Sequence, residues 1–219
     1  MRLILVRHGQ TPSNVRGVLD TLPPGPGLTR LGQEQAAVLP DVLGPEPVGV
    51  LVASTALRAR LTAAPLARDL ELPVLVRPGA REVSAGDLEM RGDQESIYTY
   101  MSTIFGWAAG DVDRRIPGGP DGIETFGRFD EVVDEAMSAA GDLTAVVVCH
   151  GALIRGWCAA RTSNVDVPFV ARTGLNNTGA VVLERGAEGS WHALSWMGEA
   201  IGGRSLDDEG TEGPAGQSV

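Results

Sequence analysis

Short, continuous apolar runs recur along this chain, and each run ends in polar or turn-forming residues. Runs of this kind are typical of strands buried on both faces of a sheet. The pattern predicts strands at residues 2–7, 48–53, 73–76, 144–149, 179–184 and 191–196. The last two follow each other closely and are expected to be antiparallel strands that close one edge of a mostly parallel sheet.

Segments with apolar residues every three or four positions lie between these runs and predict helices. The predicted helices cover residues 29–43, 56–70, 93–109, 123–140 and 152–161. Thr29 is a good N-cap for the first of them, and Gly44 with Pro45 ends it. Alternating strands and helices indicate an α/β chain with its sheet at the centre.

The length of 219 residues suits one large domain. We expect a single domain over residues 1–198, in which residues 89–122 form a cap-like insertion ending in a Gly- and Pro-rich flexible hinge or loop. Residues 10–27 are expected to be a loop. Residues 199–219 are rich in Gly, Asp and Glu, and this composition predicts a disordered tail.

Composition and charge narrow the possible partners. The hydrophobic share of 43% supports a sizeable core, and the net charge of −10 argues against binding to nucleic acid or to anionic membranes. Two cysteines make no disulfide framework, and no apolar run reaches the length of a membrane span. Met1 leads directly into the first strand, which leaves no room for a signal peptide. We therefore expect a cytoplasmic protein.

Two of the three histidines follow predicted central strands. Arg7, His8 and Gly9 end the first strand, and His150 with Gly151 ends the fourth. Ligands of open α/β sheets bind outside the carboxyl ends of the strands, so both imidazoles are expected at one edge. A cation beside an imidazole suits an anionic substrate and a nitrogen nucleophile. The first tripeptide alone would also be compatible with an ordinary loop histidine.

These two histidine motifs resemble those of the histidine phosphatase superfamily, whose fold is named after phosphoglycerate mutase. Further similar stretches follow in the family's order: Leu28-Thr29-x-x-Gly32-x-x-Gln35-Ala36, Ser54-x-x-Leu57-Arg58-Ala59-Arg60-x-Thr62-Ala63 and Arg81-Glu82-x-x-x-Gly86-x-Leu88-Glu89. The resemblance covers about residues 1–185 and is nearest to actinobacterial members with the loop found here at residues 19–25. It implies a three-layer α/β/α sandwich.

The resemblance also implies roles for single residues. His8 would attack phosphorus and become phosphohistidine, and a main-chain carbonyl near Gly9 is expected to fix its tautomer. Glu82 would protonate the leaving group, which requires a raised pKa. The remaining predicted residues would bind the phosphoryl group or substrate, and they are Arg7, Asn14, Arg58, His150, Gly151 and Asn177. Arg60 is expected on the surface. No metal or cofactor is expected.

The expected activity is metal-independent hydrolysis of a small phosphorylated metabolite. Phosphoglycerate mutase is the alternative within the same fold, although Gln10 stands where many family members have Glu. A cysteine phosphatase is a second alternative, because Cys149 and Arg155 have Cys-x5-Arg spacing. A non-catalytic phospho-ligand binder is a third. The segment Leu88 to Arg91 differs from the sequence that usually follows the acidic residue, here Glu82, in the family. A homodimer through a sheet edge is possible.

Overall fold

The computed structural model describes residues 1–186, 189–207 and 213–217 and contains one mixed, 6-stranded sheet. The strand order is β3-β2-β4-β1-β5-β6. The strands are β1 (Arg2–Arg7), β2 (Val48–Ser54), β3 (Val74–Arg77), β4 (Thr144–Cys149), β5 (Ala180–Arg185) and β6 (Trp191–Met197). The first four in chain order are parallel, and β5 and β6 add the antiparallel edge, as the sequence predicts.

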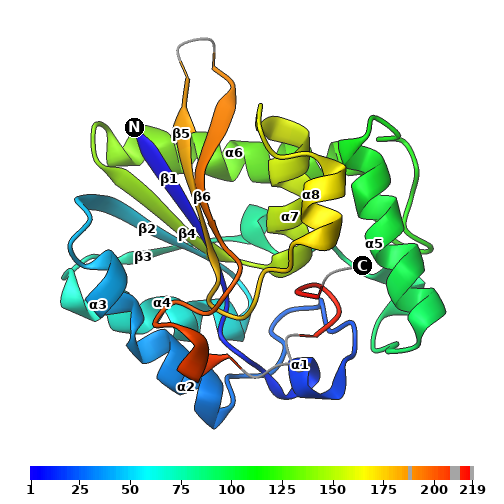
Figure 1. Ribbon diagram of the computed structural model, residues 1–219, viewed down its shortest axis with the longest axis horizontal. Coiled ribbons are helices and arrows are strands. Elements are labelled where there is room, and N and C mark those ends of the chain that lie inside the picture. The colour runs from blue at the N-terminus through cyan, green and yellow to red at the C-terminus, as the bar shows by residue number, and fades with distance from the viewer. Residues whose placement is uncertain (187–188, 208–212, 218–219) are drawn as a thin grey trace.

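Helices cover both faces of the sheet and make the two outer layers (Figure 1). They are α1 (Pro12–Arg16), α2 (Arg30–Ala37), α3 (Leu39–Leu43), α4 (Leu57–Asp69), α5 (Gln94–Ala108), α6 (Gly122–Ala140), α7 (Gly151–Arg161) and α8 (Val167–Arg172). Because side chains alternate along a strand, Leu3 and Leu5 pack toward α5, α6 and α7, whereas Ile4 and Val6 pack toward α3 and α4. The predicted three-layer α/β/α sandwich is confirmed.

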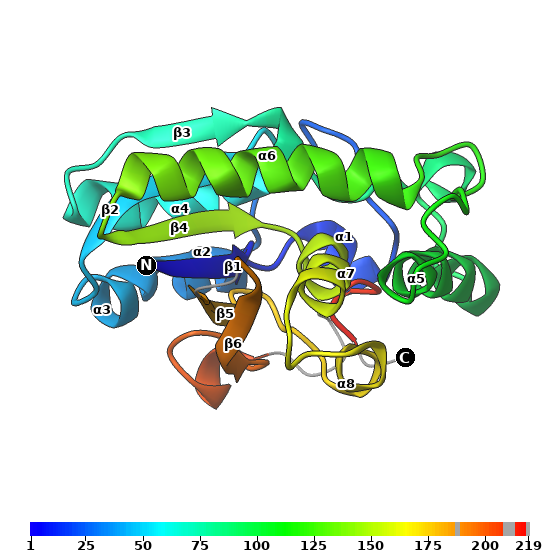
Figure 2. The same cartoon turned by 90° about the horizontal axis from the view of Figure 1, so that it is seen from above.

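The pairing of β1 with β4 fixes the place of the predicted chemistry. Arg7 stands opposite Cys149 in this parallel register. The residues that follow these two, His8 and His150, therefore leave the sheet side by side. Figure 2 shows β1 and β4 running together toward the end where α1 and α7 begin.

The predicted helix over residues 29–43 is divided into α2 and α3. Thr29 caps the first part as predicted, since its side chain accepts from the Gly32 amide at 3.0 Å. The division falls at Val38, two residues before Pro40. Proline has no N–H for the bond to the carbonyl four residues earlier and its ring clashes with that carbonyl, so the continuous helix is broken there.

The short helix α1 was not predicted, because residues 10–27 were expected to be a loop. Thr11 and Asn14 form a capping box around its first turn, and Pro12 occupies the first helical position. Helix α8 was missed as well. It begins after Asp166, whose carboxylate accepts from the Phe169 amide. Both helices are too short to show an apolar period.

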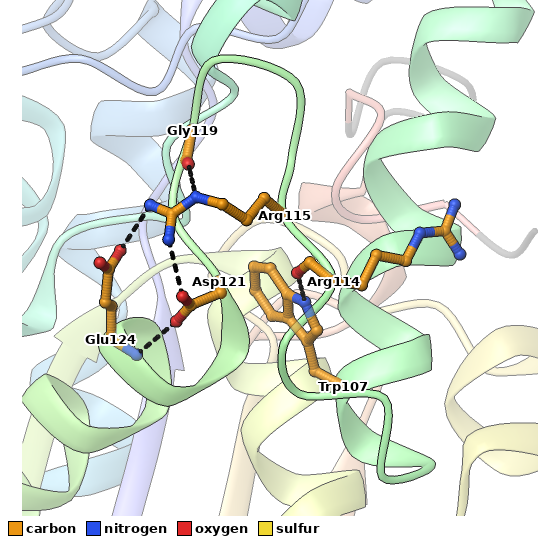
Figure 3. A network of polar contacts seen from close by, with 6 residues as sticks. All are labelled: Trp107, Arg114, Arg115, Gly119, Asp121 and Glu124. Atoms are coloured by element: carbon orange, nitrogen blue, oxygen red, sulfur yellow. Dashed lines mark hydrogen bonds and ion pairs between the residues drawn. The ribbon is translucent and has the colours of Figure 1, made fainter.

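The Gly- and Pro-rich connection between α5 and α6, predicted as a flexible hinge or loop, is held by a polar network (Figure 3). Arg115 donates to the carbonyl of Gly119 at 3.1 Å, to Asp121 at 2.7 Å and to Glu124 at 3.1 Å. Asp121 is also the N-cap of α6. The start of α6 is thereby tied to the connection. The cap-like role of residues 89–122 stays a prediction.

The structure differs from the predicted disordered tail over residues 199–207 and 213–217, which make defined contacts. Gln35 donates to the carbonyl of Leu206 at 2.8 Å. Leu175 donates to the carbonyl of Gly216 at 2.9 Å. Composition could not reveal these contacts, because they use main-chain groups that every residue carries. The rest of the predicted tail, residues 208–212 and 218–219, lies outside the described residues.

Within the described part of the chain, no helix has both the length and the apolar character needed to cross a membrane.

Two helical glycines are predicted to respond oppositely to substitution by alanine. A Cβ on Gly32 would meet the main chain of Gln10, so Gly32→Ala should lower the free energy of unfolding by about 1 to 3 kcal/mol. A Cβ on Gly127 would meet nothing within 4 Å, so Gly127→Ala should raise it by about 0.5 to 1 kcal/mol. Urea unfolding measures both changes. Equal free energies of unfolding for the two variants would contradict the tight contact between Gly32 on α2 and the main chain of Gln10.

Candidate active site

Five of the predicted site residues line one cavity at the carboxyl end of the sheet. They are Arg7, His8, Asn14, Arg58 and Glu82. They come from the end of β1, from α1, from the first turn of α4 and from the loop after β3. The fold therefore brings these residues together from distant parts of the chain.

The imidazole of His8 is buried and held in one tautomer. Its Nδ1 lies 2.8 Å from the carbonyl oxygen of Gly9. A carbonyl oxygen only accepts, so Nδ1 carries the proton and Nε2 keeps its lone pair. The predicted contact near Gly9 is thus confirmed. Burial lowers the pKa of His8 well below its ordinary value, and the charges of Arg58 and Arg7 lower it further. His8 is neutral at physiological pH.

Arg58 brings a desolvated positive charge to the cavity. Its side chain is 3% exposed, and its Nη1 has no hydrogen-bond partner among the described residues. Burial lowers its pKa, although Glu82 and Asp20 oppose this effect. Arg7 donates from Nη1 to the carbonyl of Leu175 at 2.6 Å. Arg60, two positions along the same helix, is exposed as expected.

The Glu82 carboxyl group lies at the N-terminus of α7. Its Oε1 accepts from the amides of Val83 and Leu153, both at 2.9 Å, and its Oε2 accepts from Ala152 at 3.2 Å. Burial raises the pKa of Glu82, and it outweighs these three hydrogen bonds and the charge of Arg58. A proton taken up by this carboxyl group would sit on Oε2, because Oε1 accepts the two shorter hydrogen bonds.

Two side chains from the helical layer fix the loop that carries Glu82. Arg128 on α6 donates to the carbonyls of Gly79, of Arg81 at 2.7 Å and of Glu82 at 3.1 Å. The hydroxyl group of Tyr100 on α5 donates to the carbonyl of Val83 at 2.7 Å. These contacts bind successive parts of the loop, so the position of the acid depends on α5 and α6.

His150 lies beside His8 but does not line the cavity. The two ring centroids are 5.2 Å apart. Nε2 of His150 is 2.7 Å from Oγ of Ser54, whereas its buried Nδ1 has no partner among the described residues. Burial is the largest of the effects that lower the pKa of His150 well below its ordinary value. The ring is therefore neutral, with one nitrogen position left for a ligand.

Asn177 and Gly151 support the site without lining the cavity. Asn177 does so through hydrogen bonds, and Gly151 does so by allowing close packing. Asn177 donates to the carbonyl of His8 at 3.0 Å and to Oδ1 of Asn14 at 3.3 Å. This second contact uses the amide oxygen of Asn14 and leaves its nitrogen for the cavity. Gly151 begins α7, and a Cβ there would lie 2.9 Å from the carbonyl oxygen of Ala215 and 3.0 Å from Nε of Arg7. A glycine is needed at this close approach.

Sequence reasoning missed several residues that shape the site. Thr62 accepts from the Gly9 amide at 2.9 Å, and its spacing from Arg58 on one helix could have indicated this. Tyr100, Pro214 and Ala215 line the cavity. These three, like Arg128, carry no local signal, because only the tertiary fold brings them to the site.

The cysteine phosphatase alternative fails on geometry. Cys149 is fully buried in the core cluster between the sheet and α7, and it does not line the cavity. Burial raises the pKa of its thiol, so the thiolate needed for attack is disfavoured. The guanidinium of Arg155 donates to main-chain carbonyls, including two hydrogen bonds to the carbonyl of Val170 at 3.2 and 2.6 Å.

Among the described residues, no group of three or more His, Cys, Asp or Glu could hold a metal ion.

Comparison with known proteins identifies the family. A family model for the histidine phosphatase superfamily (branch 1) matches residues 3–197. The chain belongs to this superfamily. The resemblance read from the motifs is thereby confirmed.

Relatives within the superfamily carry different names. PE-PGRS family protein PE_PGRS11 of Mycobacterium tuberculosis is 33% identical over 216 residues, which are 92% of this chain and 37% of that protein. This chain therefore spans little more than a third of that relative. Adenosylcobalamin/alpha-ribazole phosphatase of Salmonella typhimurium is 31% identical over 151 residues, or 68% of this chain and 74% of that one.

A solved structure extends the similarity to three dimensions. Mycobacterial glucosyl-3-phosphoglycerate phosphatase complexed with VO3 superposes with a TM-score of 0.74 at 27% identity. The match covers 90% of this chain and 98% of the other. The histidine phosphatase architecture is thus conserved over nearly the whole of both chains.

The two cysteines should be unreactive in the folded protein. Cys149 and Cys158 are both buried, and burial raises the pKa of both thiols. We expect 5,5′-dithiobis(2-nitrobenzoate) to label neither thiol until urea unfolds the chain, and both thereafter. Rapid labelling of Cys149 in the native enzyme would contradict the geometry and revive the cysteine alternative.

Proposed function

We propose that this chain is a phosphomonoester hydrolase that passes the phosphoryl group to Nε2 of His8 and then to water. The observation that carries the proposal is the contact of His8 Nδ1 with the Gly9 carbonyl, inside a cavity shared with Arg58 and Glu82. This contact leaves a neutral nitrogen nucleophile, and the neighbouring groups supply positive charge and a proton.

Binding rests on buried donors that a phosphoryl group would satisfy. Arg58 is desolvated, with Nη1 lacking a partner among the described residues, and an anion would offset the cost of burying its charge. Arg7 stands beside it in the cavity. The amide nitrogen of Asn14, which lines the cavity, is a further donor. His150 does not line the cavity, but its ring lies beside that of His8, and its unpartnered Nδ1 is proposed to donate as well. Asn177 supports the site through the main chain of His8.

The first step exchanges one bond at phosphorus for another. Nε2 of His8 attacks phosphorus, and the bond to the ester oxygen breaks. The proton on Oε2 of Glu82 moves to the leaving oxygen, which departs as an alcohol. The bond from Nε2 leaves the imidazole cationic because Nδ1 keeps its proton on the Gly9 carbonyl.

The second step restores the enzyme. Glu82, now a carboxylate, takes a proton from water as the water oxygen attacks the phosphohistidine. The bond between phosphorus and Nε2 breaks, its electron pair returns to His8, and inorganic phosphate leaves. Glu82 ends protonated and His8 ends neutral, so the cycle balances without a further reactant.

The arginines supply the charge stabilisation in this proposal, and it needs no metal ion or cofactor.

The substrate is proposed to be a small phosphorylated metabolite. The phosphatase names of the relatives favour hydrolysis over the mutase alternative and over a non-catalytic binder. The compounds in the relatives' names, alpha-ribazole as its phosphate ester and glucosyl-3-phosphoglycerate, are the first to screen. Residues 89–122 are proposed to select the substrate, since Tyr100 lines the cavity. The cytoplasmic location and the homodimer stay predictions.

His8→Ala should abolish the hydrolysis of p-nitrophenyl phosphate in the presence of EDTA, because among the described residues that line the cavity His8 alone has an imidazole nitrogen with a free lone pair. The wild type should remain active with EDTA. His192→Ala is the matched control, since His192 is an exposed residue on β6 whose ring contacts Ser163 and Asn164. It should retain full activity.

Two results would count against this reading. Full activity of His8→Ala would refute the phosphohistidine route. Interconversion of phosphoglycerates by the wild type without release of inorganic phosphate would assign the chain to the mutase alternative.

The loss of activity caused by Glu82→Gln should depend on the leaving group of the substrate. With an alkyl phosphate, kcat/KM should fall on the order of 10² to 10⁴-fold, because the alkoxide then leaves without a proton. With p-nitrophenyl phosphate, whose leaving group is a weak base, the loss should be much smaller. Glu34→Gln, in an exposed ion pair with Arg30, is the control. Equal losses with both substrates would contradict the acid role.

The dependence of kcat/KM on pH should reflect the titration of the two buried groups, His8 and Glu82. Burial lowers the pKa of His8, so the nucleophile is neutral and active above that pKa. Burial raises the pKa of Glu82, so the acid keeps its proton until the pH passes above its ordinary range. For alkyl phosphates, kcat/KM should therefore fall on the alkaline side through Glu82, and Glu82→Gln should remove that limb.

A further inference from the structure

The C-terminal residues 213–217 lie along the catalytic cavity, although the sequence marks them as a tail. Both Figure 1 and Figure 2 draw this segment beside α1 and α7. Pro214 and Ala215 line the same cavity as His8 and Arg58. The following inference rests on the proposed function of that cavity.

The segment touches the groups that are proposed to bind the phosphoryl group. A Cβ on Gly213 would lie 2.6 Å from Nδ2 of Asn14. A Cβ on Gly216 would overlap Nη1 of Arg7. The main chain of the segment therefore lies directly against an amide and a guanidinium that the substrate would need.

Hydrogen bonds to main-chain carbonyls hold the segment in place. Leu175 donates its amide to the Gly216 carbonyl at 2.9 Å. Arg155, on α7, donates from Nη1 to the carbonyls of Ala215 at 3.0 Å and Gln217 at 2.8 Å. Arg155 is fixed by its two contacts to Val170, so it forms a rigid anchor. The contacts from Leu175 and Arg155 end on neutral carbonyls, which can bind water instead when the segment leaves.

The cavity is too small for a substrate while the segment is in place. Its volume is about 30 Å³. On a comparable measure a site for one water needs about 10 to 15 Å³, so the cavity has room for about two or three waters, whereas a phosphate ester carries four oxygens and a leaving group. The walls from β1 and α4 are fixed by sheet and helix hydrogen bonds. The C-terminal segment is a wall that can withdraw without unfolding either element.

We propose that residues 213–217 form an autoinhibitory strap, which competes with the phosphoryl group for Arg7 and Asn14. The strap and the substrate exclude each other. The apparent affinity for any phosphorylated ligand is then lowered by the fraction of molecules in which the strap is open. Whatever withdraws the strap activates the enzyme without touching a catalytic side chain.

The test compares the full chain with a truncation that lacks residues 213–219. The truncation should bind inorganic phosphate at least tenfold more tightly by calorimetry. It should raise kcat/KM for p-nitrophenyl phosphate by a similar factor, mainly through a lower KM. A synthetic peptide of residues 213–219 should inhibit the truncated enzyme competitively.

A point variant tests the same contact in the complete chain. Gly216→Ala places a methyl group on the guanidinium of Arg7, so the strap should detach and phosphate should bind more tightly. Gly127→Ala, whose Cβ meets nothing within 4 Å, is the control and should leave phosphate affinity unchanged. If the truncation does not fold, as judged by circular dichroism, this variant decides the question.

The outcomes separate the two proposals. Unchanged or weaker phosphate binding in a folded truncation overturns the strap, because the segment is then a bystander or a permanent wall. If neither form hydrolyses p-nitrophenyl phosphate, the proposed function fails, while phosphate affinity still decides on the strap. Equal hydrolysis and equal phosphate affinity in both forms refute the strap alone.

Discussion

The parallel pairing of β1 with β4 is the constraint on which the rest of the site depends. It sets Arg7 opposite Cys149, so the chain leaves the sheet at His8 and His150 side by side, with ring centroids 5.2 Å apart. A slip of one residue in either strand would send its apolar side chains to the wrong helical layer, since Leu3, Ile4 and their neighbours alternate between two cores. The burial of the strands therefore fixes the catalytic geometry.

Burial also decides the protonation states, which the sequence alone leaves open. The same desolvation lowers the pKa of His8 and raises that of Glu82, so both groups are driven toward their neutral forms. Neutral forms suit a nucleophile and a general acid. Arg58 cannot lose its charge in this way, because a guanidinium stays protonated even when burial lowers its pKa. The cavity thus combines neutral reactive groups with fixed positive charge, an arrangement complementary to a phosphoryl dianion.

Local patterns predicted what depends on local structure. Apolar runs marked the strands, Thr29 marked a helix start, and the motifs around Arg7, Arg58 and Glu82 marked residues that do share a cavity. Contacts between distant segments were not predictable. Nothing in residues 79–83 indicates that Arg128, 46 residues beyond Glu82, holds its carbonyl. Composition likewise predicted a disordered tail, because it contains no information on which main-chain carbonyls find donors.

Main-chain carbonyls are the common element in these missed contacts. Arg128 holds the acid loop and Arg155 holds the C-terminal segment, and the acceptors in both cases are peptide oxygens. An arginine bound to carbonyls keeps its positive charge at that contact, because a peptide oxygen, unlike a carboxylate, carries no net negative charge. Arg7 and Arg58 add to this charge, and the net charge of the chain is nevertheless −10. The positive potential is therefore local to the cavity, and an acidic surface would favour phosphoryl groups that reach this cavity over polyanions that bind broadly.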